Sequence, residues 1–107
     1  MRVQELQRAH YKAQIQETLN RETQGEQYFH DEIIKTRIDE VVSALALGCS
    51  LQRPRMFRNR LMTAEDFRRI AEHITWEQIG VAVDARIKKA EAVSNPTWYI
   101  LGILARF

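Results

Sequence analysis

Hydrophobic and polar positions follow helical periods along most of the chain, and the first helical segment is the most polar. Residues 2–24 contain no Pro or Gly and are rich in Gln, Glu, Arg and Lys, which favours a helix. The apolar positions of this segment form only a thin stripe, made of Val3, Leu6, His10, Ala13 and Leu19. A helix with so little apolar surface is marginal alone, so we expect it to need a partner element or a second copy of itself.

Residues 31–47 carry the strongest helical pattern. Asp31 can cap the first turn, and the wide apolar face consists of Ile33, Ile34, Ile38, Val41, Val42 and Leu45. Gly48 follows at the position where a helix end favours a left-handed residue. We therefore predict a central core helix that ends at Gly48.

The helical pattern breaks over residues 49–62. Pro54 is excluded from a helix interior, and arginines alternate there with apolar residues. This alternation predicts a short extended segment near residues 55–58, around Met56 and Phe57.

Two capping boxes start the next two helices. The run Thr63–Asp66 begins a helix whose face is formed by Phe67, Ile70, Ala71 and Ile74. The run Thr75–Gln78 begins a helix whose inner face is formed by Ile79, Val83, Ile87 and Ala90.

The last helix starts at Asn95-Pro96, an arrangement typical of a helix N-terminus. Tyr99, Ile103 and Phe107 recur every four residues and therefore share one helical face. We expect Ile103 to be buried against the Ile79–Ile87 face, with both aromatic side chains nearer the surface.

These segments predict an all-α fold, a small bundle of about five helices. A long polar N-terminal helix, residues 1–26, serves as an arm or an oligomerisation element, and residues 30–107 form one helical domain. The last three helices of that domain form a compact unit.

Composition argues against catalysis. A single cysteine, Cys49, excludes an internal disulfide, and His10, His30 and His73 fall on separate elements without metal-ligand spacing. The four glycines form no phosphate-binding loop. We expect no enzymatic activity, no cofactor and no metal. The chain shows neither a signal peptide nor a membrane-spanning run, so we expect a cytoplasmic protein without a membrane partner.

Charge is distributed unevenly. Residues 1–47 hold six Lys or Arg and eight Asp or Glu, whereas residues 48–107 hold ten and six. A polyanionic partner is therefore expected at the second half. The candidate nucleic-acid-binding residues are Arg53, Arg55, Arg58, Arg60, Arg68, Arg69, Lys88 and Lys89, with Arg86 as an extension of the patch. Guanidinium groups interleaved with Leu51, Met56 and Phe57 suit phosphates and stacked bases. The alternative is a solvated basic loop, or arginines that pair with acidic side chains of protein.

The spacing Tyr99-x-x-x-Ile103-x-x-x-Phe107 resembles the Tyr-x-x-x-Ile-x-x-x-Trp motif of DnaD-type replication proteins, with Phe in place of Trp. The order of short helices in residues 61–65, 76–90 and 95–104 also resembles that family. Residues 30–107 are similar as well to the C-terminal helical domain of replication initiator proteins from plasmids and conjugative elements, in which a helix like 38–42 precedes an irregular segment.

The resemblance implies a role in replication initiation or restart, with binding to DNA, often single-stranded, and recruitment of the replicative helicase. Its motif positions would place partner contacts at Tyr99, Ile103 and Phe107. We expect no counterpart of the N-terminal winged-helix domain that is usual in the family, because about thirty residues of polar helix stand in its place.

Two hypotheses follow from these patterns. The first is a non-enzymatic DNA replication accessory of a phage, plasmid or mobile element, which binds nucleic acid, the replicative helicase, or both. The alternative is a protein–protein adaptor or inhibitor from a mobile element without nucleic-acid binding, in which residues 1–24 self-associate or hold a partner.

Overall fold

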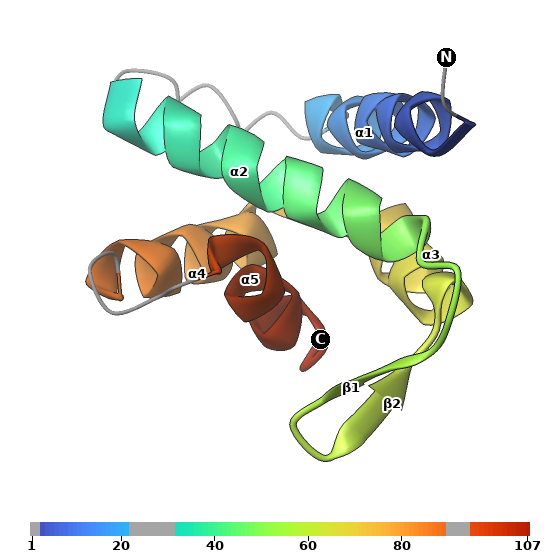
Figure 1. Ribbon diagram of the computed structural model, residues 1–107. Coiled ribbons are helices and arrows are strands. Elements are labelled where there is room, and N and C mark those ends of the chain that lie inside the picture. The colour runs from blue at the N-terminus through green and yellow to red at the C-terminus, as the bar shows by residue number, and fades with distance from the viewer. Residues whose placement is uncertain (1–2, 22–31, 90–94) are drawn as a thin grey trace.

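The computed structural model describes residues 3–21, 32–89 and 95–107, which form five helices and one β-hairpin (Figure 1). The elements in chain order are α1 (Val3–Asn20), α2 (Glu32–Cys49), β1 (Arg55–Phe57), β2 (Arg60–Met62), α3 (Ala64–Glu72), α4 (Trp76–Lys88) and α5 (Pro96–Leu104). The predicted all-α bundle is confirmed, and the predicted extended segment is the first strand of the hairpin.

Helix α2 is the centre of the bundle. It lies between α1 on one side and α4 and α5 on the other, and α3 packs near its C-terminal end (Figure 1). The buried residues of α2 are Ile38, Val41, Val42, Ala44, Leu45, Ala46, Gly48 and Cys49, which confirms the predicted core helix. Ile33 was expected on the inner face, but it lies in the first turn and its side chain is 66% exposed.

Gly48 does not end α2, contrary to the sequence prediction. The helix continues to Cys49, and none of the described glycines has a positive φ. A Cβ at Gly48 would lie 2.7 Å from Cγ of Phe67 and 2.9 Å from Cδ2 of Leu101. The glycine therefore serves close packing, because it lets side chains of α3 and α5 approach the backbone of α2.

The stripe predicted on α1 is wrong at three of its four described side chains and correct at Leu19. Leu6 is 57% exposed, and His10 and Ala13 are also exposed, whereas Ile15 and Leu19 are buried at 0% and 2% exposure. The side chain of Val3 lies outside the described ones. Helix α1 packs on α2 and α3 through the face that carries Ile15 and Leu19, so it finds its partner elements within the chain.

Both predicted capping boxes are present. At α3, the hydroxyl of Thr63 accepts a hydrogen bond from the backbone N–H of Asp66, and the backbone N–H of Thr63 donates one to the Asp66 carboxylate. At α4, Thr75 and Gln78 form the same pair of hydrogen bonds.

The inner face of α4 differs from the prediction at one described residue. Ile79 and Val83 are buried, but Ile87 is 43% exposed. The buried position in the last turn belongs to Arg86, and Ala90 lies outside the described residues. Arg86 continues the stripe because it follows Ile79 and Val83 at the helical spacing i, i+4, i+7.

Helix α5 begins at Pro96 as expected, although the side chain of Asn95 forms no capping hydrogen bond. Ile103 is buried at 6% exposure, Tyr99 is half-buried and Phe107 is 40% exposed, as expected for all three. The helix packs on α2 and α4.

Three helix ends receive hydrogen bonds from side chains distant in the sequence. Trp76 Nε1 donates a hydrogen bond of 2.9 Å to the carbonyl of Leu19 in α1. Arg68 Nε donates a hydrogen bond of 2.9 Å to the carbonyl of Cys49 in α2. Arg60 Nη1 donates to the carbonyl of Ala105 after α5 at 2.7 Å. The last carbonyls of a helix have no intrahelical donor, so these bonds stabilise the ends of three helices.

Candidate nucleic-acid interface

The hairpin that carries the basic run has an inner and an outer face. Its strands pair antiparallel in the register Arg55–Met62, Met56–Leu61 and Phe57–Arg60. Paired residues share a face and successive pairs alternate between faces. Phe57 and Met62 are buried, so the pairs at both ends form the inner face, and Met56 and Leu61 form the outer face.

Arg58 occupies the turn of the hairpin with an unusual backbone. Its φ is 59°, in the left-handed region, and it is the only non-glycine among the described residues with a positive φ. The turn consists of Arg58 and Asn59, since Phe57 pairs with Arg60. For a residue with a Cβ this region costs roughly 1–2 kcal/mol, and glycine or asparagine is usual there. The chain therefore keeps an exposed arginine at a position where its backbone is strained.

Arg55 rests on an aromatic platform. Its guanidinium carbon lies 3.7 Å from the centroid of the Trp98 ring of α5. The ring of Phe57 lies 6.2 Å from that of Trp98 and 5.4 Å, edge to face, from that of Phe67. The Arg55 side chain is exposed, and within residues 3–21, 32–89 and 95–107 no carboxylate pairs with it. The stacking fixes the plane of the guanidinium, so its N–H groups remain available to an anion from solvent.

Other members of the predicted basic set form bonds within the chain. Arg60 binds the end of α5, and Arg68 binds the end of α2 and lies 5.2 Å from the ring centroid of Tyr11. Arg69 pairs with Glu65 at 3.2 Å and Lys88 with Asp84 at 2.9 Å, both one turn apart on exposed helix surface. The hydrogen bond and the charge of Asp84 raise the pKa of Lys88.

Arg53 and Lys89 are exposed, Arg53 just before the hairpin and Lys89 at the end of α4. The structure thus brings Arg53, Arg55, Arg58 and Arg60 together on or beside the hairpin. It places Arg68 against α1, whereas Lys88 and Lys89 lie at the far end of another helix.

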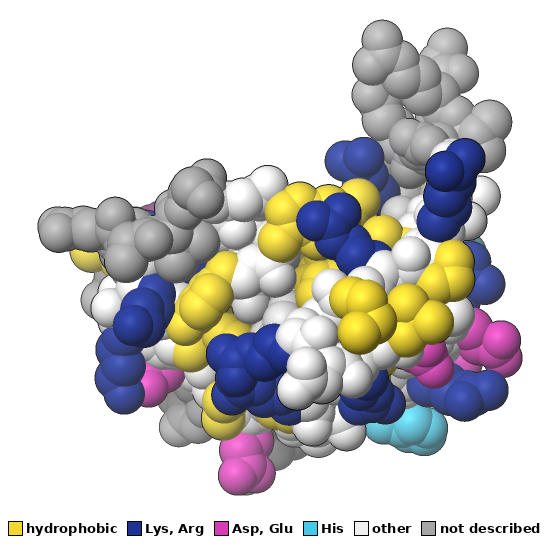
Figure 2. All heavy atoms as spheres, turned by 60° about the horizontal axis from the view of Figure 1, so that its bottom comes forward, with side chains coloured by type: hydrophobic (Ala, Val, Ile, Leu, Met, Phe, Trp, Pro, Cys, Tyr) yellow, Lys and Arg dark blue, Asp and Glu magenta, His cyan; other side chains and the backbone are white. Residues whose placement is uncertain are grey.

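The face that contains the hairpin carries many basic and apolar side chains among uncharged surface (Figure 2). Lys and Arg side chains are spread over it with hydrophobic side chains between them, and Asp and Glu side chains lie toward its margins. Such a surface has the charge and the mixture of side chains that a nucleic acid can use.

A shallow cavity of about 280 Å³ lies where the hairpin meets α3 and α4. It is lined by Arg60, Asp66, Arg69, Ile70, His73, Gln78 and Phe107. Hydrogen bonds from the backbone and hydroxyl of Thr63 lower the pKa of Asp66, and Arg69 and Arg60 lower it further. The ionised carboxylate places a negative charge in this cavity, so the cavity is less suited to phosphate than the surface around Arg55.

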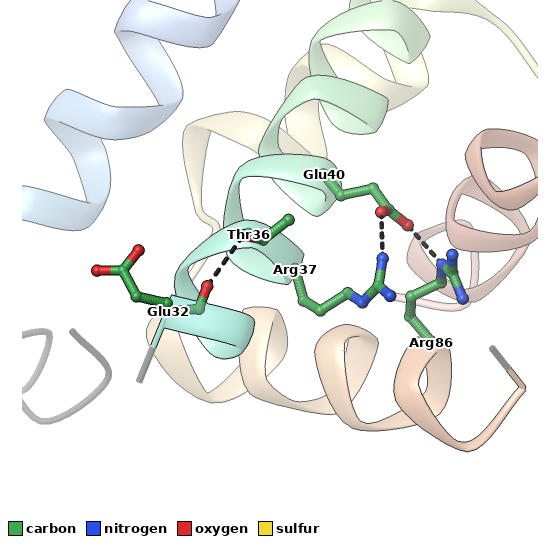
Figure 3. A network of polar contacts seen from close by, with 5 residues as sticks. All are labelled: Glu32, Thr36, Arg37, Glu40 and Arg86. Atoms are coloured by element: carbon green, nitrogen blue, oxygen red, sulfur yellow. Dashed lines mark hydrogen bonds and ion pairs between the residues drawn. The ribbon is translucent and has the colours of Figure 1, made fainter. Parts of the chain in front are cut away.

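Arg86 does not extend the basic patch, contrary to the sequence prediction. Its side chain is buried at 6% exposure, and its Nε donates to Glu40 Oε1 (Figure 3). Arg37 Nη1 donates to the other oxygen of Glu40 at 2.7 Å. Arg86 Nη1 is buried and has no hydrogen-bond partner within the described part of the chain. This network was not predicted from the sequence, although the helical spacing of Ile79, Val83 and Arg86 could have indicated that Arg86 lies on the inner face.

Cys49 and the described histidines form no reactive centre. Cys49 is completely buried, and this burial raises the pKa of its thiol to about 12 from 9.0. His10 is exposed on α1, His73 is exposed at the C-cap of α3, and His30 lies outside the described residues. Among the residues that the structure describes, no three His, Cys, Asp or Glu side chains gather to hold a metal ion.

None of the described helices has the length and hydrophobicity needed to cross a bilayer. Comparisons of the chain with protein-family models, with curated proteins and with solved structures found no match.

Proposed function

We propose that this chain binds nucleic-acid phosphates through the hairpin arginines Arg53, Arg55 and Arg58, and that it serves DNA replication as a non-enzymatic accessory. The observation that carries the proposal is the position of Arg55, stacked on Trp98 at 3.7 Å and exposed to solvent. A guanidinium that is already held in one plane loses less conformational entropy when it binds a phosphate.

Arg58 supports the same surface. A strained backbone that carries an exposed, charged side chain is more often retained for binding than for stability. Glycine would relieve the strain at this turn, but it would remove the charge from the tip of the hairpin.

The replication part of the proposal rests on the resemblance of residues 30–107 to DnaD-type and plasmid initiator proteins. Tyr99 on α5 and Phe107, which follows the end of this helix, keep part of their surface exposed, as a contact with a helicase would require. Ile103 is buried, so its contribution to such a contact would be to hold α5 in place.

Binding to a fluorescent oligonucleotide, measured by anisotropy over a salt series, tests the proposal. Wild type should bind at low salt, with an affinity that falls steeply as salt rises. Arg55→Met should weaken binding and reduce the salt slope by about one. Arg69→Met is the matched control, because Arg69 is equally basic and exposed but already pairs with Glu65.

Arg58→Gly separates binding from folding. This variant should bind more weakly and yet be at least as stable as wild type, because the turn loses its strain. Undetectable binding at low salt, or an affinity that does not depend on salt, would refute the phosphate mechanism.

A further inference from the structure

The outer face of the hairpin departs from the usual pattern of a two-stranded antiparallel sheet. Such a sheet alternates apolar residues toward the core with polar residues toward solvent. Here the inner residues Phe57 and Met62 are buried as expected, but the outer cross-strand pair is Met56 and Leu61, each 57% exposed. Both outward positions in the middle of the hairpin are therefore large and apolar.

Position and charge add to this departure. The hairpin projects from the helices at one end of the bundle, so its outer face is accessible (Figure 1). Exposed Arg53 precedes the first strand, exposed Arg58 forms the turn, and residues 49–62 contain no acidic residue. All charged side chains on and beside the hairpin in residues 49–62 are therefore basic, and they flank the apolar pair.

The chemistry of the pair favours protein over nucleic acid. Bases stack on planar side chains, and the planar groups of this region, Phe57 and Trp98, lie on the inner side of the hairpin. The flexible, aliphatic side chains of Met56 and Leu61 instead suit apolar side chains of another polypeptide. Charge complementarity with the flanking arginines requires that this polypeptide be acidic.

We propose that the Met56–Leu61 pair docks an acidic protein segment whose apolar side chains cover the pair while its carboxylates meet Arg53 and Arg58. This docking surface shares Arg53 and Arg58 with the proposed nucleic-acid site, but it does not include the Arg55–Trp98 platform that carries that proposal. It goes beyond the proposed binding of nucleic acid, and the Met56–Leu61 pair and Arg55 distinguish the two experimentally.

A peptide-display selection with a random library tests this surface. The full chain is the bait, and the double variant Met56→Ser/Leu61→Ser is used for counter-selection. The peptides that survive should combine apolar residues with flanking Asp or Glu. A fluorescent synthetic copy of one such peptide should bind the double variant about tenfold more weakly than wild type, and more weakly at high salt.

Val81→Ser is the matched control, because Val81 is an apolar residue of α4 with 51% exposure and no place in the hairpin. Its peptide affinity should equal that of wild type. Circular dichroism should show that all variants are folded, since the substituted side chains are largely solvated.

Three results would overturn the proposal: no peptide distinguishes wild type from the double variant, the selected peptides lack acidic residues, or the pair instead drives binding to phosphatidylglycerol vesicles. Oligonucleotide affinity of the double variant should stay at the wild-type value. If only the peptide experiment fails, the docking proposal is refuted and the nucleic-acid proposal stands. If Arg55→Met weakens oligonucleotide binding but not peptide binding, the change concerns only the phosphate site.

Discussion

Arg60 of the hairpin donates a hydrogen bond to the carbonyl of Ala105, 45 residues later, where α5 ends. A cationic donor at this position satisfies a carbonyl that the helix leaves open and also interacts favourably with the negative end of the helix dipole. Arg60 is thus primarily a structural residue that couples the hairpin to α5.

Replacement of Arg60 by Met should lower the free energy of unfolding by about 1–2 kcal/mol, since the bond has a charged donor. Arg53→Met, which removes an exposed arginine outside the strands, should change it by less than about 0.5 kcal/mol. Urea unfolding followed by circular dichroism measures both. Equal effects of the two substitutions would contradict the capping role.

Glu40 lies between two guanidinium groups, one of which is buried. Glu40→Leu should destabilise the protein by about 3 kcal/mol, because it leaves the charge of Arg86 buried without its carboxylate. The double variant Glu40→Leu/Arg86→Met should recover much of this loss. Thermal unfolding of the single and double variants completes the double-mutant cycle. If the losses of stability from the two single substitutions simply added in the double variant, Glu40 and Arg86 would not be a coupled pair.

Two glycines should respond to alanine with opposite signs. Gly48→Ala should destabilise by about 1–3 kcal/mol, since its Cβ would overlap Phe67 and Leu101. Gly102→Ala should stabilise by roughly 0.5–1 kcal/mol, because a Cβ at Gly102 meets nothing within 4 Å and alanine favours a helix. Chemical denaturation measures both changes in the free energy of unfolding, provided that the m-values are equal. If both substitutions changed this free energy with the same sign, the packing argument would be refuted.

The Asp66 carboxylate should make the stability of α3 depend on pH. Its hydrogen bonds to Thr63 lower its pKa in the folded state. Its contribution to the free energy of unfolding is therefore complete above the unfolded pKa of 3.8 and is lost as pH falls through the folded value. Asp66→Asn should therefore be less stable than wild type by about 1 kcal/mol at neutral pH, with a difference that shrinks in acid. A difference that stays constant down to about pH 2.5 would exclude this origin.

The Cys49 thiol should have the opposite pH dependence. Burial raises its pKa to about 12, so the unfolded chain ionises first and stability falls as pH rises above 9.0. The loss should approach about 1.4 kcal/mol per pH unit relative to Cys49→Ala. A thiol reagent at neutral pH should label the protein only when denaturant is added, and rapid labelling of the native state would show that the thiol is accessible.

Local signals in the sequence were sufficient for the helix starts and the core helix. The two capping boxes involve residues only three positions apart, so Thr63 and Thr75 could be recognised without a fold. The apolar face of α2 was wide enough that the exposure of Ile33 did not mislead the assignment. The break around Pro54 likewise predicted the extended segment.

Long-range partners were the part that sequence could not supply. On α1 the predicted stripe included Leu19, which is buried, and also Leu6, His10 and Ala13, which are exposed, but it left out the buried Ile15. Only the contacts of α1 with α2 and α3 distinguish these positions. Gly48 looked like a helix end because its crowding arises from residues on two other helices. In the candidate site, the basic run was visible, but Trp98 beneath Arg55 and the carbonyl partners of Arg60 and Arg68 depend on the tertiary fold.

The side-chain caps on α1 and α2 bear on how the protein is made. Trp76 and Arg68, which complete these two helices, are translated 57 and 19 residues after the carbonyls they bind. The nascent first half must therefore leave the ribosome with two unfinished helix ends and an uncovered apolar face. Stable structure should appear abruptly, late in synthesis, once α3 and α4 have emerged from the exit tunnel.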